Sequence, residues 1–150
     1  MRHVLTRVLA YDADALFRLV SDVEAYPQFI RWINALRIIG RWPSPGPGVE
    51  VFDAQAEVAF GPIRERFSTR VVADRPNLTI AVTLISGPFR RLENHWRLRP
   101  IEAGTELAFE IDIEMRSALL GRLLAANFER VAKTLVGCFE SRAAQLYGGA

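Results

Sequence analysis

The chain has 150 residues, of which 50% are hydrophobic and 24% are charged, and its formal net charge is +2. This length fits one domain with a buried core, so we expect residues 1–150 to form a single domain. The 19 basic side chains are interspersed with 17 acidic ones, which argues against a DNA-binding face. A single cysteine excludes an internal disulfide and is typical of a reducing compartment, and with only two histidines a structural metal site is not expected.

The first predicted elements are a strand at 4–9 and a short amphipathic helix at 13–20. A short strand at 36–40 and the turn-rich loop PSPGPG at 43–48 follow. No apolar stretch reaches the roughly 20 residues that a membrane-spanning helix needs. The stretch 1–17 lacks the continuous apolar segment of a signal peptide, so we expect a cytoplasmic protein.

An aromatic segment, DVEAYPQFIRW at 22–32, separates the helix from the next strand. Pro27 fixes its own backbone and disfavours the α region at Tyr26, so the chain must bend there. The bend projects Tyr26, Phe29 and Trp32 from a non-regular segment. These rings either close one end of a core or also form a wall of a site for an apolar molecule.

Strict alternation of apolar and polar residues predicts an antiparallel sheet in the middle of the chain. Its strands are expected at 50–60, 63–73, 78–84, 92–98 and 107–115. Gly61–Pro62 fits a two-residue turn between the first two of these strands. The resulting register pairs Glu57 with Arg66 and Asp53 with Arg70 on the solvent face.

The last predicted element is one helix of about 30 residues over 117–146, with apolar residues at three- and four-residue steps. Ser117 is suited to cap its start, and Gly148–Gly149 would end it. Together the elements predict an α+β fold of the helix-grip type. In this fold a curved antiparallel sheet wraps around one long C-terminal helix, with two short helices after the first strand.

The inner face of the predicted sheet combines small and polar residues. Ala54 and Ala56 lie mid-strand, where small side chains leave volume. Glu65, Thr69 and Asn94 share the inward parity, and each needs a partner if buried. They either bond one another, the backbone or buried water, or they orient a polar head group inside an apolar cavity.

Several aromatic and polar residues occur in an order that is found in one known family. They are Tyr26–Pro27, Phe29, Trp32, Gly87–Pro88–Phe89, Leu92, Asn94 and Trp96. Over Val4 to Leu146 the chain resembles the coenzyme Q-binding START-domain family, bacterial relatives of the mitochondrial ubiquinone chaperones. One departure is Arg31, which stands where these proteins usually have proline.

The resemblance implies the same helix-grip fold and non-catalytic binding of ubiquinone or a similar prenyl lipid. This binding would support quinone biosynthesis and respiratory electron transport. The lipid would be a bound ligand, and no cofactor or metal is implied. The implied partners are a hydrophobic small molecule, a membrane surface contacted transiently, and quinone biosynthetic or respiratory enzymes. We therefore expect the protein at the periphery of the inner membrane.

The strand parities and the resemblance together predict the ligand site. Its cavity and entrance should be formed by Tyr26, Phe29, Trp32, Phe52, Ala56, Phe60, Glu65, Phe67, Thr69, Phe89, Asn94, Trp96, Leu120, Leu124 and Phe128. The membrane-facing candidates, in which cations flank apolar side chains, are Phe89, Arg90, Arg91, Leu119, Arg122 and Leu123. Alternatively, the leucines at 119 and 123 simply pack under a loop.

We expect the protein not to be an enzyme, because the sequence shows no nucleophilic set, phosphate loop or metal spacing. His95 falls on the outward parity, and Cys138 beside Phe139 is typical of a core residue. Glu65 is the one inward-facing group suited to acid–base chemistry. A polyketide cyclase or dehydratase that shares the fold is one alternative. A ribosome-associating, toxin-like interaction protein is another; scattered arginines disfavour it, whereas Arg122, Arg130 and Lys133 would support it.

Overall fold

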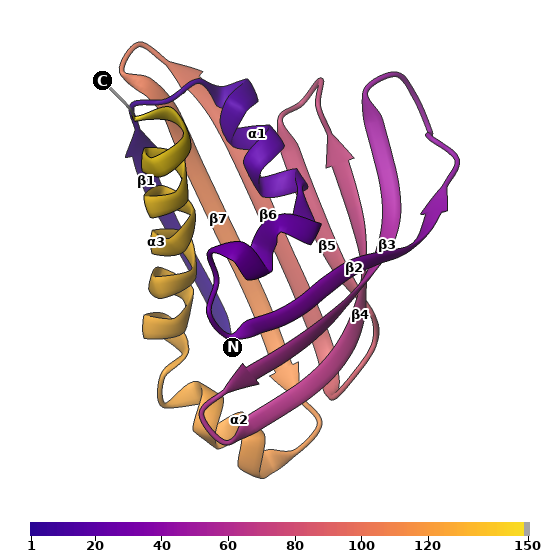
Figure 1. Ribbon diagram of the computed structural model, residues 1–150. Helices are drawn as coiled ribbons and strands as arrows, with labels where there is room; N and C mark the ends of the chain where they lie inside the picture. The colour runs from indigo at the N-terminus through magenta and orange to yellow at the C-terminus, as the bar shows by residue number, and fades with distance from the viewer. Residues whose placement is uncertain (149–150) are drawn as a thin grey trace.

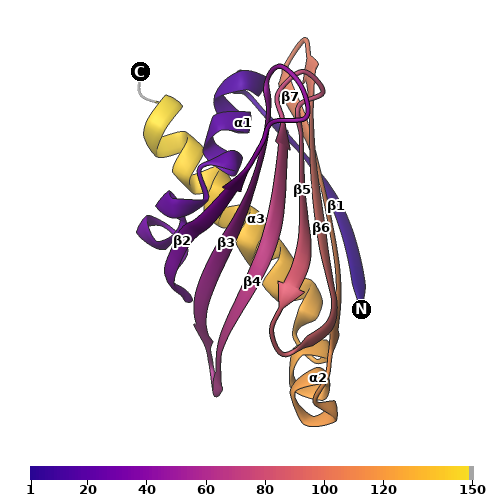
Figure 2. The same cartoon turned by 90° about the vertical axis from the view of Figure 1, so that its right-hand side faces the viewer.

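A seven-stranded antiparallel sheet curves around a long C-terminal helix in the computed structural model, which describes residues 1–148 (Figure 1). The elements are β1 (Arg2–Leu9), α1 (Ala13–Ser21), the 3₁₀ helix η1 (Val23–Gln28), β2 (Ile33–Trp42), β3 (Val49–Phe60), β4 (Ile63–Asp74), β5 (Thr79–Ser86), β6 (Phe89–Ile101), β7 (Gly104–Met115), α2 (Ala118–Ala125) and α3 (Phe128–Tyr147). The strand order is β1-β7-β6-β5-β4-β3-β2, so β1 and β2 form opposite edges. Figure 2 shows α3 running obliquely across one face of the sheet. The expected helix-grip arrangement is confirmed.

The register predicted for the first long hairpin is also confirmed. Glu57 pairs with Arg66 across β3 and β4, and Asp53 pairs with Arg70. Their side chains form ion pairs on the outer face, with N···O distances of 2.6 and 2.9 Å. The two-residue turn and the alternating pattern act locally, so sequence alone was sufficient to set this register.

Several strands are longer than predicted, among them β1, β6 and β7, and two differences have a clear structural cause. Strand β2 extends over Ile33–Trp42 instead of 36–40, because it follows the long strand β3 almost to its ends, with two register shifts on the way. Leu78 does not begin a strand; it lies in the turn before β5 with a positive φ of 53°.

The single helix predicted over 117–146 is two helices. Helix α2 ends at Ala125, and Asn127 leaves the helical conformation, with φ −127° and ψ 8°. The apolar stripe of the sequence continues through the break. The helix is divided because α2 packs on one apolar cluster and α3 on another. Ser117 caps α2 as predicted, accepting a hydrogen bond from the Leu120 N–H at 3.3 Å. Helix α3 ends at Tyr147 with Gly148 as its C-terminal cap, and Gly149 lies outside the described residues.

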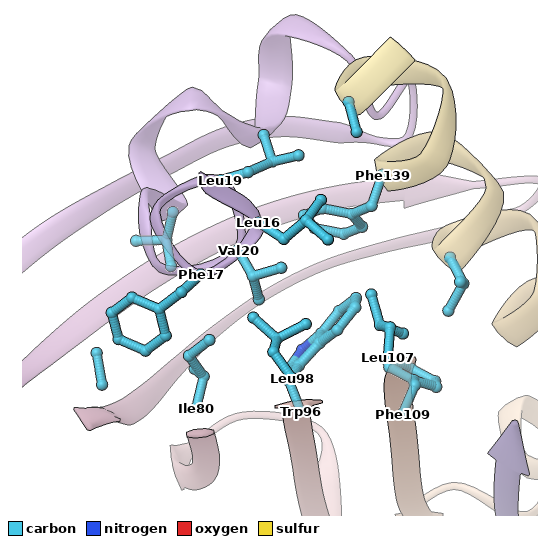
Figure 3. Close-up of a cluster of buried hydrophobic side chains, with 14 of the residues drawn as sticks. Leu16, Phe17, Leu19, Val20, Ile80, Trp96, Leu98, Leu107, Phe109 and Phe139 are labelled. Carbon is cyan, nitrogen blue, oxygen red and sulfur yellow. The ribbon is translucent and has the colours of Figure 1, made fainter. Parts of the chain in front are cut away.

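The buried side chains form two clusters at opposite ends of the sheet's concave face. In the larger one, Leu16 and Val20 from α1 lie with Phe139 from α3 and Trp96 from β6 (Figure 3). The smaller cluster lies under α2. It contains Phe89, Leu92, Ile113, Met115 and Phe128, with Phe67, Ile111, Leu120 and Leu124 packed against it. The space between these clusters holds the candidate site.

Candidate ligand cavity

An apolar cavity of about 150 Å³ lies between the concave face of the sheet and α3. Six of the residues predicted from the sequence line it: Tyr26, Ala56, Phe67, Thr69, Asn94 and Trp96. The wall also contains residues that the predicted site lacked, among them Leu36, Ala54, Val58, Ile111, Leu135 and Phe139. The inward parity of Ile111 and the place of Leu135 on the apolar stripe of the last helix were signals that could have identified these two residues.

Small side chains on β3 border the cavity. Ala54 and Ala56 are 3% and 7% exposed, and they pair with Thr69 and Phe67 on β4. A methyl group at these positions does not reach α3, so the space in front of it is left to the cavity. The prediction that these small residues leave volume agrees with this geometry.

The polar residues on the wall differ in how they are bonded. The side-chain amide of Asn94 donates to the Glu110 carbonyl at 2.8 Å and accepts from the Trp96 indole N–H at 2.8 Å. These bonds hold Asn94 and Trp96 in one fixed arrangement. The hydroxyl of Thr69, a residue only 8% exposed, makes no hydrogen bond with any residue in 1–148. Thr69 is therefore the polar group of the wall with bonding capacity to spare.

Aromatic rings pack edge to face at the η1 end of the cavity. Tyr26, Phe29 and Trp96 all surround Phe139, with ring centroids 5.1, 5.1 and 4.8 Å from it. The Tyr26 hydroxyl donates to the Val20 carbonyl, and burial raises the pKa of this phenol. The phenol therefore stays protonated. The aromatic segment thus closes one end of the core, and Tyr26 also reaches the cavity wall.

Four predicted site residues lie away from the cavity. Trp32 and Phe60 stack edge to face on each other, with centroids 5.7 Å apart, at the tip of the β3–β4 hairpin. Phe52 is buried beside a separate, charged cleft under Arg41. Phe29 packs edge to face on the Tyr26 ring, 5.9 Å between centroids, and is not part of the cavity wall. Strand parity predicted the inner face for Phe52 and Phe60, but it does not specify the position along the strand or the neighbours. Phe29 and Trp32 were predicted from the aromatic segment, which gives no position relative to the sheet.

Glu65 also lies away from the cavity. It lines a shallow depression beside Asn34 and Arg66. Strand β4 pairs with β5 only from Ser68 onwards. The end of the β3–β4 hairpin that carries Glu65 therefore extends beyond the part of the sheet in which β5 lies beside β4. Within residues 1–148, Tyr26 is the one titratable side chain on the cavity wall. This arrangement offers no carboxylate for acid–base chemistry on a ligand in the cavity.

The remaining predicted residues belong to the α2 end. Phe89, Leu120, Leu124 and Phe128 form or contact the smaller cluster. Phe89 is 7% exposed, so it is not membrane-facing as predicted; it packs against the Phe67 ring, 5.1 Å between centroids. Arg91 lies on the outer sheet face, paired with Asp112 and Glu114.

The other membrane-facing candidates are at the surface. Leu119 is 65% exposed and Leu123 is 41% exposed. Arg90 and Arg122 are also exposed. The two leucines therefore do not pack under a loop.

Other side chains that could take part in catalysis or metal binding are isolated in the described part of the chain. His95 is exposed on the outer face, as its parity predicted. Cys138 is half-buried, and burial raises the pKa of its thiol. Among residues 1–148, no group of three or more histidine, cysteine or acidic side chains is placed to hold a metal ion. In the same range, every helix is too short or too polar to cross a bilayer.

Comparison with known proteins adds relatives to this geometry. The family profile described as "Polyketide cyclase / dehydrase and lipid transport" matches residues 9–140. The chain is 33% identical over 144 residues to "Ribosome association toxin RatA" of Rickettsia prowazekii, covering 94% of each chain. It is 29% identical over 147 residues to "Coenzyme Q-binding protein COQ10 homolog B, mitochondrial" of Xenopus laevis, covering 95% of this chain and 58% of that protein. A solution structure of an 18 kDa protein from Caulobacter crescentus has 46% identity and a TM-score of 0.81, over 99% of both chains.

Proposed function

The chain belongs to the polyketide cyclase/dehydrase and lipid-transport family, and we propose that it binds ubiquinone or a similar prenyl lipid without chemical change. The observation that carries this proposal is the apolar cavity with the unpartnered Thr69 hydroxyl on its wall. Small-molecule sites typically combine an apolar lining with a few placed polar groups. The absence of a carboxylate from the described wall favours binding over catalysis.

The residues that line the cavity suit a quinone head group. An apolar cavity of about 150 Å³ accommodates one six-membered ring. Each quinone carbonyl accepts hydrogen bonds, and the Thr69 hydroxyl is free to donate one. The faces and edges of Trp96 and Phe139 offer the offset and edge-to-face contacts that aromatic rings prefer.

The proposal includes transient contact with a membrane surface at the α2 end of the molecule. Leu119 and Leu123 project outward from α2, where burial in a bilayer would be favourable. Arg122 lies between these leucines in α2, and Arg90 follows Phe89 of the cluster under α2. Both are exposed, and cations there favour anionic lipid headgroups. The protein would act at the periphery of the membrane and exchange its ligand there with quinone biosynthetic or respiratory enzymes.

Mass spectrometry of the lipid that copurifies with the protein tests the proposal. Protein from a quinone-containing host should carry a prenyl quinone extractable into organic solvent. Thr69→Val keeps the shape of the side chain and removes the hydroxyl, so it should retain less quinone while keeping its fold. Protein that takes up no quinone, even when mixed with quinone-loaded vesicles, would contradict the proposal.

Ribosome association is the second candidate, because a relative at 33% identity carries that name. On α3, Arg130 and Lys133 are exposed, although Lys133 is paired with Glu129 at 2.8 Å. These residues and Arg122 are the exposed cations that α2 and α3 would offer to RNA. Cosedimentation with ribosomal subunits tests this candidate. Binding should weaken steeply with salt and with Arg130→Glu if the phosphate backbone is the partner.

A further inference from the structure

We infer that the apolar cluster under α2 is a second part of the ligand site, which takes the lipid's apolar tail when α2 lifts. This inference rests on the proposed function. Its starting point is size, because ligand sites usually measure roughly 300–1,000 Å³. The cavity of about 150 Å³ holds a ring but not a ring with an alkyl or prenyl chain. A tailed ligand therefore needs space that side chains fill in this structure.

The shared lining of the cavity and the cluster indicates the direction of that space. At the α1 end, the cavity abuts Phe139 and Trp96, which pack with Leu16 and Phe109 in the larger core. At the other end, the cavity wall and the cluster under α2 share Phe67, Leu92 and Ile111. Because the same side chains belong to both, the cluster adjoins the cavity in this direction.

Helix α2 is held on the sheet more loosely than α3. None of the residues of α2, Ala118–Ala125, is buried, whereas α3 buries five of its side chains. The inner side chains of α2, Leu120 and Leu124, are half-buried. Asn127, between the helices, makes no side-chain capping hydrogen bond to α3, and its amide donates to the Leu123 carbonyl of α2 only at a long 3.4 Å. Lifting α2 uncovers the smaller cluster, but it removes no fully buried side chain of its own from the core and leaves α3 on the sheet.

Two phenylalanine rings separate the cavity from the cluster. Phe67 lines the cavity, and Phe89 belongs to the cluster; their rings meet edge to face at 88°. A ring in a loosely covered cluster changes rotamer at small cost once its neighbours on α2 move away. The Phe67–Phe89 pair is then the gate through which the tail passes, and Leu120 and Leu124 cover the tail when α2 closes.

A disulfide that fixes α2 to the end of β7 tests this inference. A side chain at Gly121 would place its Cβ 3.8 Å from that of Met115, within the roughly 3.5–4.5 Å that a disulfide spans. The variant combines Met115→Cys and Gly121→Cys with Cys138→Ser, so that no other thiol is present. Met115→Ser with Gly121→Ser in the same background is the unlinked control.

The probes are 2,3-dimethoxy-5-methyl-1,4-benzoquinone, which has no tail, and its decyl derivative. Binding is followed by quenching of tryptophan fluorescence, since Trp96 lies on the wall. The disulfide should weaken binding of the decyl compound by about tenfold or more and leave binding of the tail-less quinone unchanged. Equal affinity of the linked and unlinked proteins for the decyl compound would overturn the inference.

A second variant keeps the test decisive if the linked protein fails to fold. Leu124→Phe enlarges a half-buried side chain on the inner face of α2 and should weaken binding of the decyl compound alone. Equal effects on both probes, or none on either, would overturn the tail site. If the unmodified protein binds neither compound, the proposed function itself fails, which is a result distinct from both.

Discussion

Replacing Ala56 with leucine should stabilise the protein and abolish ligand binding at the same time. Ala56 is buried on β3, and its methyl group borders the cavity. Leucine adds three carbons, which contribute about 2.4 kcal/mol when buried, at about 0.8 kcal/mol for each CH₂. Ordering the longer side chain costs about 0.5–1 kcal/mol. The net gain of about 1.5 kcal/mol corresponds to a rise in Tm of roughly 3–6 °C for a chain of this length.

Thermal unfolding followed by circular dichroism, together with quinone titration, measures both effects. Ala108→Leu is the matched control, because Ala108 lies on the outer face of β7 beside a shallow hollow and not on the cavity. This control should leave quinone binding intact. If Ala56→Leu lowers Tm, the cavity cannot accept the added carbons. If quinone binding survives in Ala56→Leu, the ligand does not occupy the cavity.

Three further predictions concern single side chains. Asn94→Leu should lower the free energy of unfolding in urea by about 1–3 kcal/mol, because the Trp96 indole N–H loses its acceptor; an unchanged value would show that water replaces the amide. The hydrogen bond from Arg70 lowers the pKa of Asp53, so this pair stabilises the protein above pH about 4 and the effect is lost as pH falls. Urea midpoints of the native protein and Arg70→Gln should therefore differ at pH 7 and converge in acid, and a constant difference would contradict this. Burial raises the pKa of Cys138, so its thiol should react with Ellman's reagent at pH 8 more slowly in the folded protein than in urea; equal rates would show that the thiol is exposed.

The parts of the fold that depend on near neighbours in sequence were predictable. The pairing of Asp53 with Arg70 follows from a two-residue turn and strict alternation. The break at Asn127 was not predictable in the same way, because the helical apolar stripe runs through it without proline or glycine. The helix is divided because its two parts pack against different apolar clusters. Local helix propensity carries no information about this tertiary packing.

The face of the sheet that carries the candidate site was predictable, but the extent of the site along the strands was not. The inward parity of Thr69 and Asn94 placed both on the cavity wall. The same parity placed Glu65 on the inner face, yet this residue lies beyond the edge of the neighbouring strand. The length of β5 decides that outcome, and the sequence of β4 carries no information about it.

The strand order has a consequence for the route by which the chain folds. Strands β2 to β7 follow one another as hairpins, so each can pair soon after it is made. Strand β1 must instead wait for β7, because Arg2 pairs with Asp112 and Leu9 with Thr105. During synthesis the first strand is therefore left without its partner until nearly the whole sheet has emerged. The closing of this edge, a pairing of distant segments, should be the slow step of folding.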